Sequence, residues 1–109
     1  MKQVEAIVAS AKLNEVRASL ARAGVDGMTV VEVLGFGTSA EPPERSAEHK
    51  RAAPRVKVKI VVEDGRVPAL VQELLRAVRT GRVGDGKIFV LPVDDAVRIR
   101  TSERGRDAL

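Results

Sequence analysis

The stretch RVKVKIVVEDGRVPALVQELLRAV, residues 55–78, decides the fold. Apolar and polar side chains largely alternate over Val56–Val62, which is the period of a β-strand with one buried face. Asp64-Gly65 is a turn signal, and Pro68 suits the first turn of a helix because its missing N–H is not needed there. Apolar residues then recur at helical spacing, at Leu70, Val71, Leu74, Leu75 and Val78. The stretch therefore predicts a strand, a tight turn and an amphipathic helix.

The same succession of elements occurs in the first third of the chain. Lys2–Ala9 is rich in Val and Ile and predicts a strand. Lys12–Ala23 predicts a helix, with Ser10 as its N-cap and Gly24 as its terminator. A second strand is expected over Met28–Leu34, which gives a first β-α-β unit.

A glycine-rich loop over Thr80–Lys87 and a strand over Ile88–Val93 complete a second β-α-β unit. Two such units predict one α+β domain, residues 1–109, with the ferredoxin-like fold: a four-stranded antiparallel sheet with both helices on one face. The strands carry apolar residues on both sides, and two helices cover only one face. We therefore expect the other face to be buried between subunits of a homo-oligomer.

The connection between the two units has an unusual composition. Residues 38–55 contain no Val, Ile, Leu, Met or Phe and hold three of the five prolines. Such a segment buries too little apolar area to offset its ordering entropy, about 1–2 kcal/mol per residue. It predicts a long mobile loop that orders on a partner protein. Its charges have mixed sign and indicate no single class of target: Glu41, Glu44, Arg45, His49, Lys50 and Arg51.

The composition excludes several kinds of site. There is no Cys, Trp or Tyr, and the single His lies in the 38–55 connection. A thiol nucleophile and a disulfide framework are excluded, a zinc site is very poorly supported, and no acid–base constellation favours a small oligomeric enzyme. No apolar run is long enough to span a membrane and no signal-peptide pattern opens the sequence, so we expect a cytoplasmic protein. The net charge of +4 fits nucleic acid, phosphate ligands or no specific partner, and composition alone favours the last.

The loop Gly81-Arg82-Val83-Gly84-Asp85-Gly86-Lys87 fills the first seven positions of a P-loop pattern. It is not a P-loop, because Ile88 stands where magnesium needs Ser or Thr, and because the loop follows a helix and opens a strand. Its glycines can still turn backbone N–H groups into one concavity that binds an anion, with Lys87 beside it. A tight helix-to-strand connection is the alternative.

Arg98 and Arg100 stand two residues apart in a strand-like run, Ala96–Arg100, within an otherwise polar tail, residues 94–109. An extended run would place both guanidinium groups on one face. By themselves these residues favour a solvated, charged edge strand that deters aggregation over a phosphate site.

Three stretches together resemble the PII signal-transduction family. They are GMTVVEVLGFG at 27–37, TGRVGDGKIFV at 80–90 and VRIRT at 97–101. The resemblance covers the whole chain except residues 38–54. It implies a homotrimer of ferredoxin-like subunits in which ATP and ADP compete for three clefts between the subunits.

The resemblance also implies roles for individual residues. Residues 80–87 would be the B-loop, which holds phosphates, and residues 37–55 the T-loop, which docks on a target. Arg98 and Arg100 would reach the phosphates of a site shared with the neighbouring subunit. Mg²⁺ would enter only together with ATP. The expected nucleotide-binding residues are Thr29 and Val61 near the adenine, and Gly35, Gly37, Gly84, Asp85, Gly86, Lys87, Arg98 and Arg100.

The departures from the family lie in or near the T-loop. The loop is short, and no Tyr is present for uridylylation. Ser39, which follows Thr38 at the T-loop root (residues 35–39), replaces a Gln that helps to hold magnesium and 2-oxoglutarate, and a hydroxyl cannot reproduce the amide geometry. Arg55 replaces a Lys and keeps its charge but not its shape. Lys59 replaces a residue that is commonly acidic. These departures predict weak or absent 2-oxoglutarate sensing.

The sequence thus predicts a non-enzymatic, nucleotide-sensing regulator. It would control a transporter or a metabolic enzyme through the T-loop, and a transporter partner would recruit it to the membrane without insertion. One alternative is a PII-like regulator of inorganic-carbon or metal transport that responds to another adenine nucleotide or small ligand. An alternative of another class is an RNA-binding ferredoxin-like module, which Phe36 and Phe89 support poorly because they do not form a stacking platform.

Overall fold

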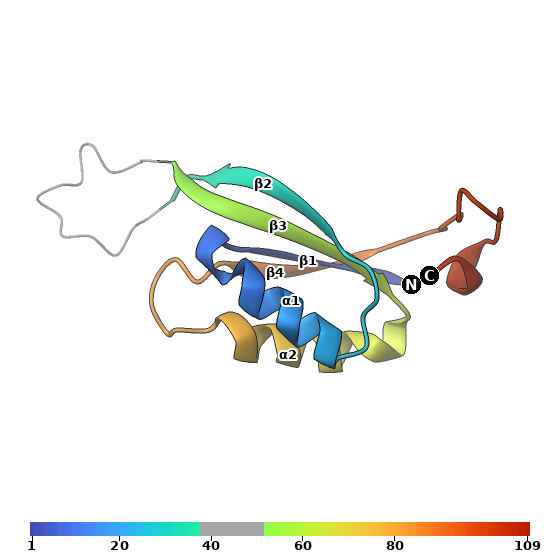
Figure 1. Ribbon diagram of the computed structural model, residues 1–109, viewed down its shortest axis with the longest axis horizontal. Coiled ribbons are helices and arrows are strands. Elements are labelled where there is room, and N and C mark those ends of the chain that lie inside the picture. The colour runs from blue at the N-terminus through green and yellow to red at the C-terminus, as the bar shows by residue number, and fades with distance from the viewer. Residues whose placement is uncertain (38–51) are drawn as a thin grey trace, which may run out of the picture.

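The computed structural model describes residues 1–37 and 52–109, in which one α-helix follows the first strand and another follows the third (Figure 1). With η for a 3-10 helix, the elements are β1 (Lys2–Ala9), η1 (Ser10–Lys12), α1 (Leu13–Arg22), β2 (Thr29–Gly35), β3 (Ala53–Val62), η3 (Asp64–Arg66), α2 (Val67–Val78), β4 (Lys87–Pro92) and η4 (Gly105–Ala108). β1 has the predicted bounds, and the other three strands of the sheet and both helices agree with the prediction to within a few residues.

The four strands form one antiparallel sheet in the order β2-β3-β1-β4. Helices α1 and α2 contact each other and lie on the same face of this sheet (Figure 1). The two β-α-β units are interleaved in this order, which is that of the ferredoxin-like fold. The predicted architecture is therefore confirmed.

The core lies between the helices and the sheet face that they cover. Alternate residues of the central strands β1 and β3 are buried there, because successive side chains of a strand point to opposite faces. The buried apolar residues are Val4, Ala6, Val8, Val16, Leu20, Val56, Val58, Ile60, Val62, Leu70, Leu74 and Val78. From the predicted face of the second helix, Val71 and Leu75 are only half-buried, and they line a cleft next to Lys87.

Gly24 ends α1 as predicted, with a φ of +71°. Its N–H donates to the carbonyl oxygen of Ala21 at 3.1 Å. The N–H of Val25 donates to the carbonyl oxygen of Leu20 at 3.0 Å, which completes a Schellman motif. The predicted N-cap is wrong: Ser10 begins η1, which precedes α1, and no side chain caps α1.

β3 begins at Ala53, so the loop predicted over 37–55 is too long at its C-terminal end. Ala53, Pro54 and Arg55 pair with residues 33–35 of β2. Composition does not reveal this pairing, because backbone hydrogen bonds rather than apolar burial hold these residues. Pro54 is tolerated since it lies beyond the last pair between β3 and β1, where only one neighbouring strand remains.

The sheet face opposite the helices, here called the open face, is uncovered in the single chain. The Glu5 carboxylate on this face lies 3.6 Å from the Lys57 Nζ. The register places the exposed apolar side chains of Val31, Phe89 and Leu91 on the same face. Exposed apolar side chains on a sheet support the expectation that another subunit covers this face.

The tail after β4 does not form the strand predicted over Ala96–Arg100. It turns back on itself, and Val97 and Arg104 make an isolated antiparallel bridge. The N–H of Ser102, a residue with a φ of +62°, donates to the carbonyl oxygen of Arg98 at 2.8 Å and closes the turn. Pairing the segment with itself satisfies backbone groups that a lone strand would leave unpaired. The resulting arm projects beyond the sheet (Figure 1).

Candidate functional site

A carboxylate closes the loop between α2 and β4. Asp85 Oδ2 accepts hydrogen bonds from the backbone N–H groups of Thr80 and Gly81 at 2.8 and 2.9 Å. Asp85 Oδ1 accepts another from the Thr80 hydroxyl. The oxygen of that hydroxyl accepts in turn from the Arg82 N–H at 3.2 Å. The shape of this loop is therefore set by its own side chains.

These hydrogen bonds keep Asp85 ionised. The bond from the Thr80 hydroxyl, followed by the bond from the Thr80 backbone, lowers the pKa of the Asp85 carboxyl below its ordinary value of 3.8. The carboxylate oxygens accept hydrogen bonds from donors of the loop itself and do not face an anion in the concavity. Asp85 therefore supports an anion site by shaping it, whereas its direct contact with a phosphate stays a prediction.

The glycines of the loop allow its backbone to lie close against β1. Gly81, Gly84 and Gly86 all have positive φ, at +81°, +102° and +106°. A Cβ at Gly86 would lie only 1.9 Å from the carbonyl oxygen of Ile7, so no other residue fits there. Lys87 follows directly and pairs with Ile7 as the first residue of β4. This geometry supports an anion-binding concavity with a lysine at its edge.

Arg55 connects this loop to the two strand ends that flank residues 38–51. Its Nη1 donates to the carbonyl oxygen of Gly84 at 2.5 Å. Its side chain crosses β2 at Gly35, where a Cβ would lie 2.9 Å from the Arg55 Cγ. The end of β2, the start of β3 and the glycine-rich loop therefore meet at one end of the sheet.

The predicted nucleotide-binding residues of the strands share the open face. In the strand register, these residues alternate with residues that face the helices. The residues on the open face are Thr29, Gly35, Val61 and Lys87, together with Arg55. Gly35, Arg55 and Lys87 lie at the end of the sheet next to the loop. Thr29 and Val61, which are predicted to contact the adenine, lie farther along β2 and β3.

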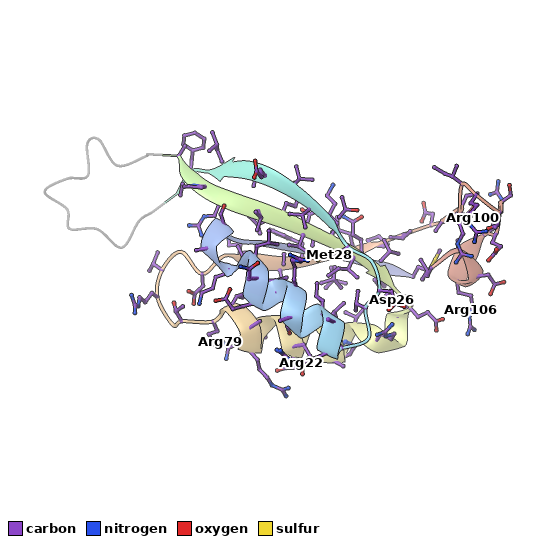
Figure 2. The ribbon with its side chains drawn as sticks, in the orientation of Figure 1. Arg22, Asp26, Met28, Arg79, Arg100 and Arg106 are labelled. Carbon is purple, nitrogen blue, oxygen red and sulfur yellow. The ribbon has the colours of Figure 1, made fainter. Side chains whose placement is uncertain are left out.

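Arg98 and Arg100 do not share one face of an extended segment, which corrects the prediction. Arg98 Nη1 lies 2.8 Å from Glu103 Oε2, and its Nη2 donates to the carbonyl oxygen of Leu109 at 3.3 Å. Arg100 lies in the turn that closes the arm. Figure 2 shows Arg100 at the opposite end of the molecule from Arg79, which precedes the loop. Within one chain these arginines are far from the loop, so a phosphate role requires a neighbouring subunit.

Part of the predicted site lies outside the described residues. These positions are Thr38 and Ser39 of the T-loop root and Glu41, Glu44, Arg45, His49, Lys50 and Arg51 of the partner-binding loop. Across residues 1–37 and 52–109, no three His, Cys, Asp or Glu side chains gather as metal ligands. In the same ranges no helix is both long and apolar enough to cross a membrane.

A hollow of about 900 Å³ lies away from the loop, between the end of α1 and α2. Two of its arginines have partners within the chain. Arg66 Nη2 donates to the carbonyl oxygen of Ala23 at 2.7 Å, and Arg76 Nη1 lies 2.6 Å from Glu73 Oε1. Most of its lining belongs to the helices α1 and α2, so it lacks the glycine-rich backbone concavity of the loop.

Comparison with known proteins decides the family. The sequence model of a family described as "Nitrogen regulatory protein P-II" matches residues 1–103. This chain belongs to the P-II family. It is 47% identical to a P-II protein of Synechocystis over 112 aligned positions and 46% identical to one of Azospirillum brasilense, with complete coverage of both chains in each case. A crystal structure of Arabidopsis thaliana PII bound to citrate superposes with a TM-score of 0.84 and 39% identity, covering 99% of this chain and 91% of that one.

Membership confirms the predicted family, the fold and the general role. P-II proteins are non-enzymatic signal transducers of nitrogen regulation. They form trimers, bind adenine nucleotides and small effectors, and regulate target proteins. A P-II trimer supplies neighbouring subunits of the kind expected to cover the open face.

Sequence reasoning missed two contacts of this P-II site. The first is the set of bonds between Thr80 and Asp85, for which the only sequence signal is a Thr five residues before an Asp in a glycine-rich loop. The second is the bond from Arg55 to Gly84. It joins residues 29 positions apart and depends on how the sheet brings β3 next to the loop.

Proposed function

We propose that this P-II protein is a regulator that binds ATP and ADP competitively in clefts between its subunits. The glycine-rich loop carries the proposal. It combines an ordered backbone concavity, three glycines at positive φ and an adjacent lysine, Lys87. In this proposal residues 84–87 hold the phosphates, Thr29 and Val61 contact the adenine, and Arg98 and Arg100 come from the neighbouring subunit. Mg²⁺ enters with ATP.

Bound nucleotide sets the conformation of the T-loop root, and the T-loop then docks on a target protein. A ligand shifts such an equilibrium only by its different affinity for the two states. The γ-phosphate of ATP distinguishes the ligands, because it brings additional negative charge near Lys87. The target is a membrane transporter or a metabolic enzyme. In the alternative, the protein regulates inorganic-carbon or metal transport instead of nitrogen metabolism.

In this proposal two regulatory signals, uridylylation and 2-oxoglutarate, are absent or weak. The chain has no Tyr, so uridylylation of a T-loop tyrosine cannot control it. Ser39 and Arg55 replace the Gln and Lys expected at the effector site, so 2-oxoglutarate leaves ATP affinity nearly unchanged. The alignment with the Synechocystis protein has three more positions than this chain, in agreement with a shortened T-loop.

Isothermal titration calorimetry with Mg-ATP, ATP alone and ADP tests the proposal. We expect saturable binding of each nucleotide and at least about a tenfold weaker affinity in Lys87→Ala. Lys2→Ala removes the same charge at the far end of β1 and should leave the affinity unchanged. If the intact protein binds no adenine nucleotide, the sensing function is wrong. A large gain in ATP affinity with 2-oxoglutarate would contradict the weak-effector part alone.

The docking step has its own test. A pull-down from source lysate with ATP or ADP should capture a target with the intact protein, and a variant that lacks residues 40–53 should lose it. A target that the shortened variant retains would show that another surface makes the contact.

A further inference from the structure

The hollow between the end of α1 and α2 combines small side chains with an excess of positive charge. The small residues leave the space between the helices unfilled; they are Ala23, Gly65, Ala69 and Ala77. Three arginines and one glutamate give the lining a net charge of +2; they are Arg22, Arg66, Arg76 and Glu73. The helices lie on the sheet face opposite the open face, so an assembly through the open face leaves the hollow accessible (Figure 1).

Two of these arginines have no carboxylate to neutralise them. Across residues 1–37 and 52–109, neither Arg22 nor Arg66 forms an ion pair. Arg66 Nη2 donates to the carbonyl oxygens of Ala23 and Gly24 at 2.7 and 3.4 Å, and both acceptors are neutral. A guanidinium has five N–H donors, so Arg66 keeps donors for a further acceptor. The hollow can therefore bind anionic groups.

The positive charge lies at two ends of the hollow. Arg66 contacts the chain just after α1, and Arg22 lines the same end. Arg76 lies one turn beyond Glu73, whose backbone carbonyl oxygen accepts a hydrogen bond at 3.0 Å from the buried Ser19 hydroxyl, an earlier turn of α1. Positions 66 and 76 are ten residues apart, nearly all of them in α2, which corresponds to about 15 Å along the helix.

This length fits a short stretch of extended peptide. Extended chain rises about 3.3 Å per residue, so about 15 Å corresponds to four or five residues. A single phosphate or a small carboxylate is too short to reach both ends at once. Guanidinium groups bind carboxylates through charge-assisted hydrogen bonds, often in a planar fork. The charge and the length of the hollow together favour an acidic protein segment over a small anion.

We propose that the hollow between α1 and α2 docks an acidic segment of a partner protein in an extended conformation. One carboxylate of the segment binds at Arg22 and Arg66, and another, four or five residues away, binds at Arg76. Glu73 competes with the second carboxylate, since its Oε1 lies 2.6 Å from the Arg76 Nη1. Among the described residues, none that lines the hollow belongs to the B-loop or the T-loop root. This contact is therefore additional to the proposed T-loop docking and does not depend on nucleotide binding.

Fluorescence anisotropy with two labelled peptides and the intact protein tests the docking. The first peptide, Glu-Glu-Ser-Ser-Ser-Glu-Glu, places two acidic pairs five residues apart. The second, Glu-Glu-Glu-Glu-Ser-Ser-Ser, has the same composition and charge without this spacing. We expect the first peptide to bind about fivefold more tightly, which corresponds to about one further ion pair. Both affinities should fall as salt is added, because the charges are exposed.

Variants of the lining separate the hollow from the general charge of the protein. Arg22→Gln combined with Arg76→Gln removes one charge from each end and should weaken binding of the spaced peptide by at least about tenfold. The matched control, Arg17→Gln combined with Arg79→Gln, removes the same charge at two exposed arginines outside the hollow. It should change the affinity by less than about twofold. Thermal melts verify that each variant is folded.

Glu73→Gln tests the hollow with every arginine in place, and it serves if the double arginine variant does not fold. Because it removes the competing carboxylate, it should strengthen binding by about two- to fivefold. Glu15→Gln removes the same charge from an exposed position of α1 and should leave the affinity unchanged. Equal gains in these two variants would overturn the proposal, as would an unchanged affinity in Glu73→Gln.

Three further outcomes would also overturn the docking. Equal losses in the two double arginine variants would mean that net charge alone attracts the peptide. Equal affinity for the two peptides would rule out a contact at both ends of the hollow. Displacement of the spaced peptide by ADP would mean that it binds at the nucleotide site and not between the helices.

Discussion

Asp85 accepts hydrogen bonds from both the backbone N–H and the hydroxyl of Thr80, five residues earlier in the chain. The Gly81 N–H adds a further bond to the same carboxylate at 2.9 Å. These bonds hold the B-loop closed without any bound ligand. A concavity that is already ordered loses less conformational entropy when a phosphate enters it.

Asp85→Asn should therefore weaken ATP and ADP binding through the order of the loop. An amide has a single acceptor oxygen and no charge, so it cannot accept all the bonds that the carboxylate accepts from Thr80 and Gly81. We expect affinities lower by about tenfold and faster amide hydrogen exchange over residues 80–86. Thr80→Ser keeps the hydroxyl and should behave like the unaltered protein. Unchanged exchange and affinity in Asp85→Asn would show that the glycines alone order the loop.

The same carboxylate predicts a pH dependence of the B-loop. Its pKa lies below the ordinary 3.8 in the folded protein, chiefly because of the Thr80 hydroxyl. A group with a lowered folded pKa contributes stability that is present above its unfolded pKa and is lost as the pH falls through the folded value. The loop should thus stay ordered near neutral pH and lose exchange protection only in acid, below the ordinary carboxyl pKa. In Asp85→Asn this acid transition of the loop amides should be missing.

Gly86→Ala should be far more damaging than a typical glycine replacement. Its Cβ would lie 1.9 Å from the Ile7 carbonyl oxygen, at a φ of +106°. We expect a loss of more than about 2 kcal/mol in the free energy of unfolding by urea, or a loop displaced from β1 and unable to bind nucleotide. Gly27→Ala is the control, because nothing lies within 4 Å of its Cβ, and it should change stability by less than about 0.5 kcal/mol.

Local sequence signals located most of the fold because they act over short distances. Gly24 ends α1 through bonds to residues only a few positions away, and its glycine is visible in the sequence. Ser10 has the chemistry of an N-cap but not its position, because η1 begins at Ser10 and separates it from α1. Ala53–Arg55 depart from the prediction because they pair with β2, and the arm after β4 departs from it because the arm pairs with itself.

In the candidate site, too, local features could be predicted from the sequence and contacts between distant residues could not. The glycines of the B-loop and Lys87 could be selected from residue types and spacing alone, because an anion concavity is a local backbone structure. The contact between Arg55 and Gly84 could not, because it joins residues 29 positions apart that meet only in the folded sheet. The position of Arg98 also depends on tertiary structure, since its partner Glu103 faces it only after the arm turns back.

Leu74→Ala tests the core that positions these elements. Leu74 lies in α2, is 0% exposed and packs in the cluster between the helices and the sheet. The substitution should cost about 2–5 kcal/mol in the free energy of unfolding, from lost burial plus the remaining cavity. Leu34→Ala, at a leucine that is 67% exposed, should stay within about 0.5 kcal/mol. Urea unfolding should be compared at equal protein concentration, because trimer formation makes apparent stability concentration-dependent.

Glu103→Gln tests whether Arg98 serves a phosphate. Glu103 lies 2.8 Å from the Arg98 guanidinium and partly neutralises it. If that guanidinium faces the phosphates of the neighbouring subunit's nucleotide, removal of the carboxylate charge should strengthen ATP binding. The pair is partly exposed, so the gain should be about two- to fivefold at low salt and should shrink as salt is added.

The arm contains a matched control for this substitution. Asp95→Asn removes a carboxylate charge from the neighbouring pair, in which Asp95 lies 2.7 Å from Arg104. Because Arg104 is not among the predicted phosphate ligands, calorimetry with ATP should show a clearly smaller change for Asp95→Asn than for Glu103→Gln. Equal gains in both variants would mean that net charge alone raises the affinity. A weaker affinity in Glu103→Gln would mean that Arg98 serves the arm, by holding its turn closed, and contributes nothing directly to the nucleotide.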